Sequence, residues 1–159
     1  MGRTDRTTDV EDTQPLSYEE ILERHARPQS SEPSDSYLYV YAIVRKDLEM
    51  PSGKLSAQAG HAYTDALDVA QLTHPERCKR YRNGIEGGSK VTLEAKNANH
   101  LVRAYNEARA SGLPCQIVVD QNHVMLPHFD GKPVITALGI GPVCKSEVKH
   151  ITKKFRCVK

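Results

Sequence analysis

Three polar side chains recur at helical spacing in the segment that follows the first strongly apolar stretch. Lys54, Gln58 and His61 are four and three residues apart, which places them on one face of a helix. Together they offer a cation, an amide and an imidazole, groups that bind anions or hydroxyls. A lysine in the first turn of a helix is disfavoured by the helix dipole by about 0.3–1 kcal/mol, so its placement invites a functional explanation. The alternative is an ordinary solvated polar face.

The elements around these residues predict how they are positioned. Residues 37–44 (YLYVYAIV) are β-branched, aromatic and apolar on both faces, which is typical of a central strand covered on both sides. A Met-Pro-Ser-Gly break follows, and the spacing predicts a helix over 53–71. A second face of this helix carries small or apolar side chains suited to packing: Leu55, Ala59, Ala62, Ala66 and Val69.

The rest of the chain continues to alternate strands and helices. Further strands are expected at 90–95, 116–119 and 134–140, further helices at 74–82, 98–111 and 145–152, a glycine-rich loop at 83–89 and an extended segment at the C-terminus. This order predicts an α/β fold in three layers, with a mixed, roughly four-stranded β-sheet flanked by helices.

Charge divides the chain into two parts. Residues 1–36 hold four Lys/Arg and nine Asp/Glu, a balance of −5, whereas residues 37–159 hold 18 and 11, a balance of +7. A basic domain suits a polyanion such as RNA, although many basic proteins have no such partner. The composition predicts that 1–36 is an acidic, largely disordered extension and that 37–159 is the folded domain. Ser17 and Glu20 form a capping box that predicts a short helix within the extension.

The cysteines and the absence of long apolar runs indicate the cellular compartment, and the spacing of possible ligands indicates whether a metal is expected. Four cysteines, Cys78, Cys115, Cys144 and Cys157, form no CxxC pair or zinc spacing, so reduced thiols in a cytoplasm are the simplest interpretation, with a disulfide left open. No signal peptide and no long apolar run is evident, so no membrane segment is expected. The histidines and aspartates match no metal-ligand pattern, and no P-loop is present.

Four motifs in order resemble one known family. The run 53–62 (GKLSAQAGHA), the segment 110–120 (ASGLPCQIVVD), the segment 136–142 (TALGIGP) and the closing 151–156 (ITKKFR) are similar to the motifs of type 2 peptidyl-tRNA hydrolases, the archaeal and eukaryotic kind. The resemblance covers 37–159. It implies cleavage of the ester between a peptide and the terminal ribose of tRNA, with no cofactor, and a homodimer.

Two departures from the family pattern lie beside the expected site. The family usually has a threonine after the aspartate, in D-A-G-x-T, but here Val124 stands where that hydroxyl belongs. The loop 127–133 (PHFDGKP) is also longer than the family's P-G-T turn. Both changes bear on substrate choice and on activity.

The resemblance assigns catalytic roles to four residues. Lys54 would hold a terminal phosphate or the developing oxyanion, and Asp120, at a strand end, would orient or deprotonate a water. Thr136 matches a second functional threonine and would hydrogen-bond the water or the ester, while His61 matches the motif histidine. The structural alternatives are a simple Lys54–Asp120 salt bridge, a strand-forming threonine and a structural histidine.

Five further residues are candidates for substrate binding. Gln58 would position either a ribose hydroxyl or a backbone group. His123 would replace the missing hydroxyl unless it is merely a solvated loop residue. Arg77, Lys79 and Arg80 form a basic cluster that would contact phosphates, or would be a solvated helix face. Two rival functions stay open: a tRNA-binding protein on the same scaffold that has lost catalysis, and a hydrolase of a different acyl ester.

Overall fold

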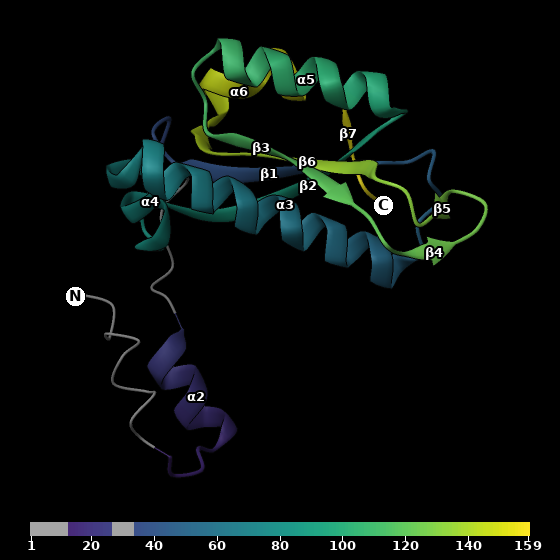
Figure 1. Cartoon of the computed structure of the whole chain (residues 1–159). Coiled ribbons are helices and arrows are strands. Elements are labelled where there is room, and N and C mark those ends of the chain that lie inside the picture. Colours follow the sequence, from purple (N-terminus) through teal and green to yellow (C-terminus); the bar gives the residue numbers. More distant parts are fainter. Residues whose placement is uncertain (1–12, 27–33) are drawn as a thin grey trace. The chain divides into compact units, whose positions relative to one another are not determined.

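The computed structural model describes residues 13–26 and 34–159, and the chain forms two compact units, 1–32 and 33–159 (Figure 1). In the first unit, α2 (Tyr18–His25) begins at Ser17, whose hydroxyl accepts from the Glu20 amide while the Glu20 carboxylate accepts from the Ser17 amide. This is the helix that the capping box predicts. The disorder expected elsewhere in the extension lies mostly on residues 1–12 and 27–33, outside the described residues.

The second unit is built on a mixed sheet with the strand order β3-β6-β1-β2-β7. Its strands are β1 (Leu38–Arg45), β2 (Gly87–Ala95), β3 (Cys115–Asp120), β6 (Val134–Cys144) and β7 (Arg156–Cys157). β1 pairs parallel with β2, and the other pairings are antiparallel. The central position of β1 agrees with its apolar character on both faces.

Helices cover both faces of this sheet, which confirms the α/β class and the three layers. α3 (Ser52–Thr73) and α4 (Pro75–Arg82) lie on one side, and α5 (Ala98–Ala110) and α6 (Lys145–Thr152) on the other (Figure 1). Three apolar clusters fill the interfaces between layers, and the smallest of them packs α3 and α4 against β1. Of the two larger clusters, one packs the α5 and α6 side of the sheet, and the other joins α3 to β1, β3 and β6.

The expected strand count was too low. The sheet has five strands, because the extended C-terminal segment pairs with β2 as β7, and a separate two-stranded hairpin joins β4 (Val124–Met125) to β5 (Phe129–Asp130). The glycine-rich stretch expected as a loop also enters β2. A Cβ on Gly87 would lie 2.9 Å from both the Leu38 Cβ and the Tyr81 Cα, so glycine here permits close strand and helix packing.

α3 approaches the sheet closely at Gly139 in β6. A Cβ at this position would lie 2.0 Å from the Ala62 carbonyl oxygen and 3.0 Å from the Ala66 Cβ. Four of the five alanines of the helix, Ala59, Ala62, Ala66 and Ala70, are buried against the sheet, whereas Ala57 is exposed. Small residues on both sides therefore set the distance at which α3 crosses the strands.

Substituting Gly139 should disturb this contact. We expect Gly139→Ala to lower the free energy of unfolding by about 1–3 kcal/mol or more, because a backbone carbonyl cannot move aside as a side chain can. Urea unfolding followed by circular dichroism measures the change. Gly60→Ala in α3 is the matched control, since a Cβ there meets nothing within 4 Å and alanine favours helix. Equal stability of the two variants would contradict the close-packing argument.

Candidate active site

The first turn of α3 meets the end of β3 at one edge of the sheet. Lys54 is the third residue of α3, and Asp120 is the last residue of β3. The Lys54 Nζ donates to the Asp120 Oδ2 at 2.9 Å, with side chains only 14% and 18% exposed. The structure thus brings together two of the four residues that the sequence predicts to be catalytic. The Asp120 carboxylate offsets the unfavourable interaction between the Lys54 ammonium and the positive end of the helix dipole. It therefore explains why a lysine is tolerated in the first turn of α3.

Two further groups surround the Lys54 ammonium. Its Nζ lies 2.8 Å from the His123 Nδ1 and 4.7 Å from the centroid of the Phe129 ring. The His123 and Phe129 rings are themselves 5.8 Å apart. The ammonium therefore contacts a carboxylate, an imidazole and the face of an aromatic ring, all of which attract a cation.

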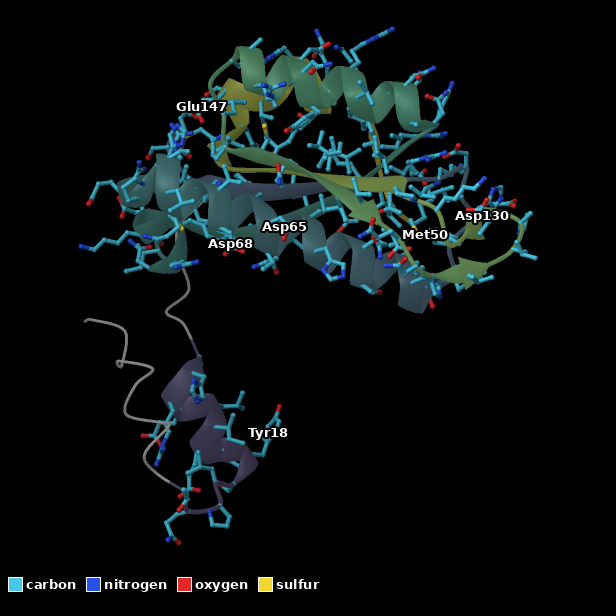
Figure 2. All side chains as sticks on the ribbon, viewed as in Figure 1. Tyr18, Met50, Asp65, Asp68, Asp130 and Glu147 are labelled. Carbon is cyan, nitrogen blue, oxygen red and sulfur yellow. The ribbon has the colours of Figure 1, made fainter. Side chains whose placement is uncertain are left out.

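The β4–β5 hairpin supplies two of these contacts. His123 directly precedes β4, and Phe129 begins β5 with its side chain almost fully buried. Figure 2 labels Asp130 on this hairpin and Met50 just before α3, both at the same end of the domain. The hairpin is formed by the segment that departs from the family pattern, and Val124 in it is 66% exposed. Sequence reasoning missed Phe129, although the unusual length of the loop was a signal.

Gln58 and Thr136 form a buried hydrogen-bonded pair between α3 and β6. The Thr136 hydroxyl donates to the Gln58 Oε1 at 2.5 Å, and Thr136 has no exposed surface. Gln58 thus belongs to the packed face of α3 and does not share the exposed polar stripe predicted with Lys54 and His61. The reason is that α3 lies flat on the sheet, so its buried face is wider than the alanine stripe alone.

Among the described residues, His61 and the basic cluster form no hydrogen bond or ion pair with Lys54 or Asp120. His61 is exposed, and its ring forms no hydrogen bond or ion pair with another part of the described chain. Arg77 donates to both carboxylate oxygens of Glu147, at 2.9 and 2.7 Å, and Arg80 reaches Glu86 at 3.4 Å. Lys79 is exposed, and within residues 13–26 and 34–159 its side chain has no such partner. α4, which carries these residues, lies at the other end of the sheet from the β4–β5 hairpin (Figure 1).

The pairing with Arg77 lowers the pKa of Glu147. Burial alone would raise the pKa of Glu147, but hydrogen bonds from Arg77 and from the Cys144 amide outweigh it and hold that pKa below its usual range. The Arg77–Glu147 contact therefore ties α4 to the start of α6. Arg77 has a structural partner in addition to any role in binding.

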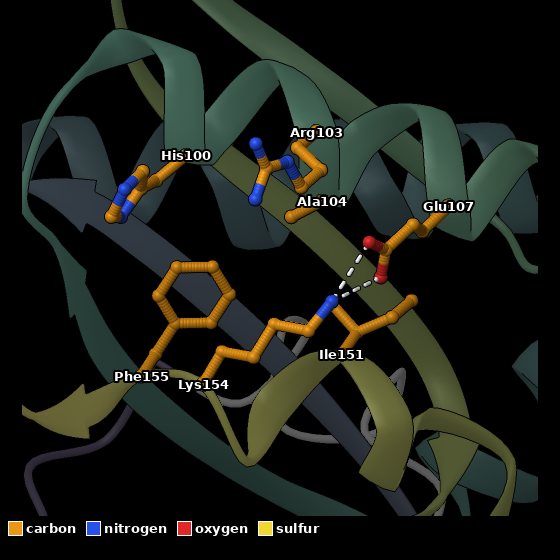
Figure 3. A pocket seen from close by; sticks show the side chains of 7 residues that line it. All are labelled: His100, Arg103, Ala104, Glu107, Ile151, Lys154 and Phe155. Carbon is orange, nitrogen blue, oxygen red and sulfur yellow. Dashed lines mark hydrogen bonds and ion pairs between the residues drawn. The ribbon is translucent and has the colours of Figure 1, made fainter.

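A cavity lies between α5 and α6, on the face of the sheet opposite α3. It is lined by His100, Arg103, Ala104, Glu107, Ile151, Lys154 and Phe155, with Lys154 paired to Glu107 (Figure 3). Its volume of about 90 Å³ is well below that of ordinary ligand sites, about 300–1,000 Å³, so it does not compete with the Lys54 centre as a substrate site. No cluster of three metal-ligating side chains occurs among the described residues.

The fold and the site define an α/β protein with a lysine–aspartate centre at the edge of a mixed sheet. Residues 38–158 match the family described as Peptidyl-tRNA hydrolase PTH2, and the chain belongs to this family. It is 34% identical over 110 residues to the peptidyl-tRNA hydrolase of Methanocaldococcus jannaschii, covering 69% of this chain and 90% of that one. It is 32% identical over 120 residues to that of Methanococcus vannielii, covering 75% and 98%.

A eukaryotic relative is similar over the same region. The probable peptidyl-tRNA hydrolase 2 of Dictyostelium discoideum is 31% identical over 114 residues, covering 72% of this chain and 51% of its own length. The resemblance seen in the four sequence motifs is thereby confirmed. None of the described helices is long and apolar enough to cross a membrane.

Removing the Thr136 hydroxyl should destabilise the protein. Thr136→Val keeps the shape but leaves the buried Gln58 carbonyl without its donor, which we expect to cost about 1–3 kcal/mol in the free energy of unfolding. Urea unfolding measures this cost. Thr136→Ser should retain the bond, and Thr64→Val, at an exposed position of α3, should change little. A Thr136→Val protein as stable as the wild type would contradict the buried pair.

The Glu147 pairing predicts a pH dependence of stability. Because the folded-state pKa is lowered, the pairing stabilises the protein above the ordinary glutamate range, and this contribution is lost as pH falls through the lowered pKa. Glu147→Gln should lose this part of the acid dependence, as measured by urea unfolding across a pH series. Glu76→Gln, exposed on α4, should keep the wild-type profile. Parallel profiles for the wild type and Glu147→Gln would contradict the assignment.

Proposed function

We propose that this protein hydrolyses the ester bond between a peptide, or an N-blocked amino acid, and the terminal ribose of tRNA. The observation that carries the proposal is the Lys54–Asp120 pair, held at 2.9 Å at the edge of the sheet in a chain of the peptidyl-tRNA hydrolase family. An ester is already activated, so its hydrolysis requires a positioned water, a proton acceptor and stabilisation of the tetrahedral oxyanion.

Asp120 is the proton acceptor in this proposal. Its Oδ2 is occupied by Lys54, and its side chain retains 18% exposure at the end of β3, from which it can accept a hydrogen bond from water. As the water oxygen bonds to the ester carbonyl carbon, the carboxylate takes the water proton. When the intermediate collapses, the ester C–O bond breaks and the ribose oxygen receives that proton.

Lys54 supplies positive charge to the same step. Its ammonium is only 14% exposed, so the charge is less screened by water than that of a surface lysine. Negative charge develops on the carbonyl oxygen during attack, and a fixed nearby cation stabilises it. The Asp120 carboxylate and the Phe129 ring hold the ammonium in place before substrate binds.

The remaining predicted residues take supporting roles. The buried Gln58–Thr136 pair joins α3 to β6 directly beneath the first turns of the helix, and we assign it a positioning role in place of direct contact with the ester. The support for His61 as a substrate contact is that it is exposed and unpaired in the described chain. Lys79, and the outward surfaces of Arg77 and Arg80, are candidates for phosphate contacts.

The proposal extends to the partners and the domain. The net charge of +7 over residues 37–159 supports binding to tRNA, with an affinity that falls as salt rises because phosphate contacts release counterions. We propose that 37–159 is the catalytic domain, and the family match over 38–158 supports it. Free cysteines support a cytoplasmic location. The homodimer is proposed on the family resemblance alone.

The proposal predicts the behaviour of two variants. We expect Lys54→Ala and Asp120→Asn each to lower the rate of acyl release from N-blocked aminoacyl-tRNA by about 100-fold or more, because they remove the cation and the proton acceptor. The measurement is release of the labelled acyl group under single-turnover conditions. Circular dichroism and urea unfolding establish that both variants are folded.

A matched control separates the site from general charge. Lys149→Ala removes an exposed lysine from α6, on the opposite side of the sheet, and should leave the rate within about twofold. Wild-type rates in both Lys54→Ala and Asp120→Asn would overturn the proposal. Salt-sensitive tRNA binding without any turnover by the folded wild type would indicate the tRNA-binding alternative, and turnover of small acyl esters alone would indicate a different hydrolase.

A further inference from the structure

The contact between Lys54 and His123 determines which ring nitrogen of His123 carries a proton. An ammonium has three donors and no acceptor. The Lys54 Nζ and the His123 Nδ1 are 2.8 Å apart, so Lys54 donates and Nδ1 must accept with its lone pair. An imidazole that accepts a hydrogen bond at Nδ1 carries its ring proton on Nε2.

The competing arrangement is an aspartate–histidine pair in which Nδ1–H donates to Asp120. The distance from the His123 Nδ1 to the Asp120 Oδ2 is 3.8 Å, which is too long for that hydrogen bond. Lys54 occupies the space between the two groups and bonds to both. His123 thus lacks the partner that would orient it as a proton acceptor, and its remaining nitrogen is a donor.

We infer that Lys54 holds His123 as the neutral Nε2–H tautomer and that this N–H donates to the carbonyl oxygen of the substrate ester as it becomes the oxyanion. The role of the donor rests on the proposed function. In this assignment His123 binds the reacting oxygen but transfers no proton. The water proton passes to Asp120 and then to the departing ribose oxygen.

Exposure and packing fit this role. The His123 side chain is 43% exposed, against 14% for Lys54 and 18% for Asp120, so it is the most accessible of the three. Its Nε2 has no hydrogen-bond partner among the described residues. The Phe129 ring, 5.8 Å away, limits rotation of the imidazole. An adjacent cation polarises the ring and makes its N–H a stronger donor.

The sequence also indicates why a donor is needed at His123. Val124 stands at the position where the family pattern has a threonine, and it has no hydroxyl to donate. His123 is the preceding residue, and the longer loop forms the hairpin whose Phe129 packs against it. The imidazole therefore restores a hydrogen-bond donor at the edge of the Lys54–Asp120 centre.

Kinetics of His123 variants test the donor. We expect His123→Ala to lower kcat for N-blocked aminoacyl-tRNA by about 100-fold with little change in KM, because the bond is strongest to the oxyanion. His123→Gln, which keeps a side-chain N–H, should recover part of the loss. His128→Ala is the matched control, since His128 lies in the same hairpin and its ring is 3.5 Å from the carboxylate of the exposed Glu49. Among the described residues it forms no hydrogen bond or ion pair with Lys54 or Asp120. A wild-type kcat in His123→Ala would overturn the oxyanion role while leaving the proposed hydrolase intact.

A second measurement does not depend on turnover. Long-range ¹H–¹⁵N NMR of the histidine rings in the full chain should show His123 as the Nε2–H tautomer, and Lys54→Met should remove that preference. A protonated Nδ1 in the neutral ring of the wild type would overturn the inference whatever the activity. If the wild type shows no turnover on any acyl-tRNA, the proposed function fails and the oxyanion role fails with it. The NMR result then decides only whether Lys54 determines the tautomer of His123.

Discussion

The close packing of α3 on the sheet is the constraint on which the site depends. Gly139 lets the backbone of α3 approach β6 to a distance that no Cβ would permit, and the buried alanines of the helix complete the contact. Because an α-helix is rigid over several turns, fixing its middle also fixes its first turn. Lys54 is thereby held beside the end of β3, where a short reach brings its ammonium to Asp120.

Electrostatics and packing reinforce each other at this edge. An ammonium that is largely removed from water requires compensation, and it obtains a carboxylate, an imidazole nitrogen and an aromatic face. One partner ends β3 and the other two belong to the hairpin segment that follows it, so the cation links α3 to β3 and to the hairpin. The same contacts that hold the domain edge together fix the Lys54 ammonium and the Asp120 carboxylate in place, which is the preorganisation that the proposed hydrolysis requires.

The hairpin contains both departures from the family pattern that the sequence shows, Val124 and the longer loop 127–133. Loss of the threonine hydroxyl at Val124 removes one donor, and the added length forms β4 and β5. The buried Phe129 then supports both Lys54 and His123. These changes belong together physically, because an imidazole can act as an oriented donor only if a packed neighbour restrains it. The hairpin segment thus supplies both the imidazole of His123 and the Phe129 ring that packs beside it.

The sequence by itself determined the family and the α/β class, because these depend on local periodicity and on motif order, and the motifs named Lys54 and Asp120 as site residues. Their contact, between residues 66 positions apart in the chain, was decided by the tertiary structure. It misassigned Gln58 to an exposed stripe, since helical spacing gives relative direction but not the width of the buried face. It also missed the fifth strand and Phe129, which depend on contacts between segments far apart in the chain. Only the tertiary structure decided that Lys54 bonds His123 at Nδ1, because the tautomer follows from which groups surround the ring.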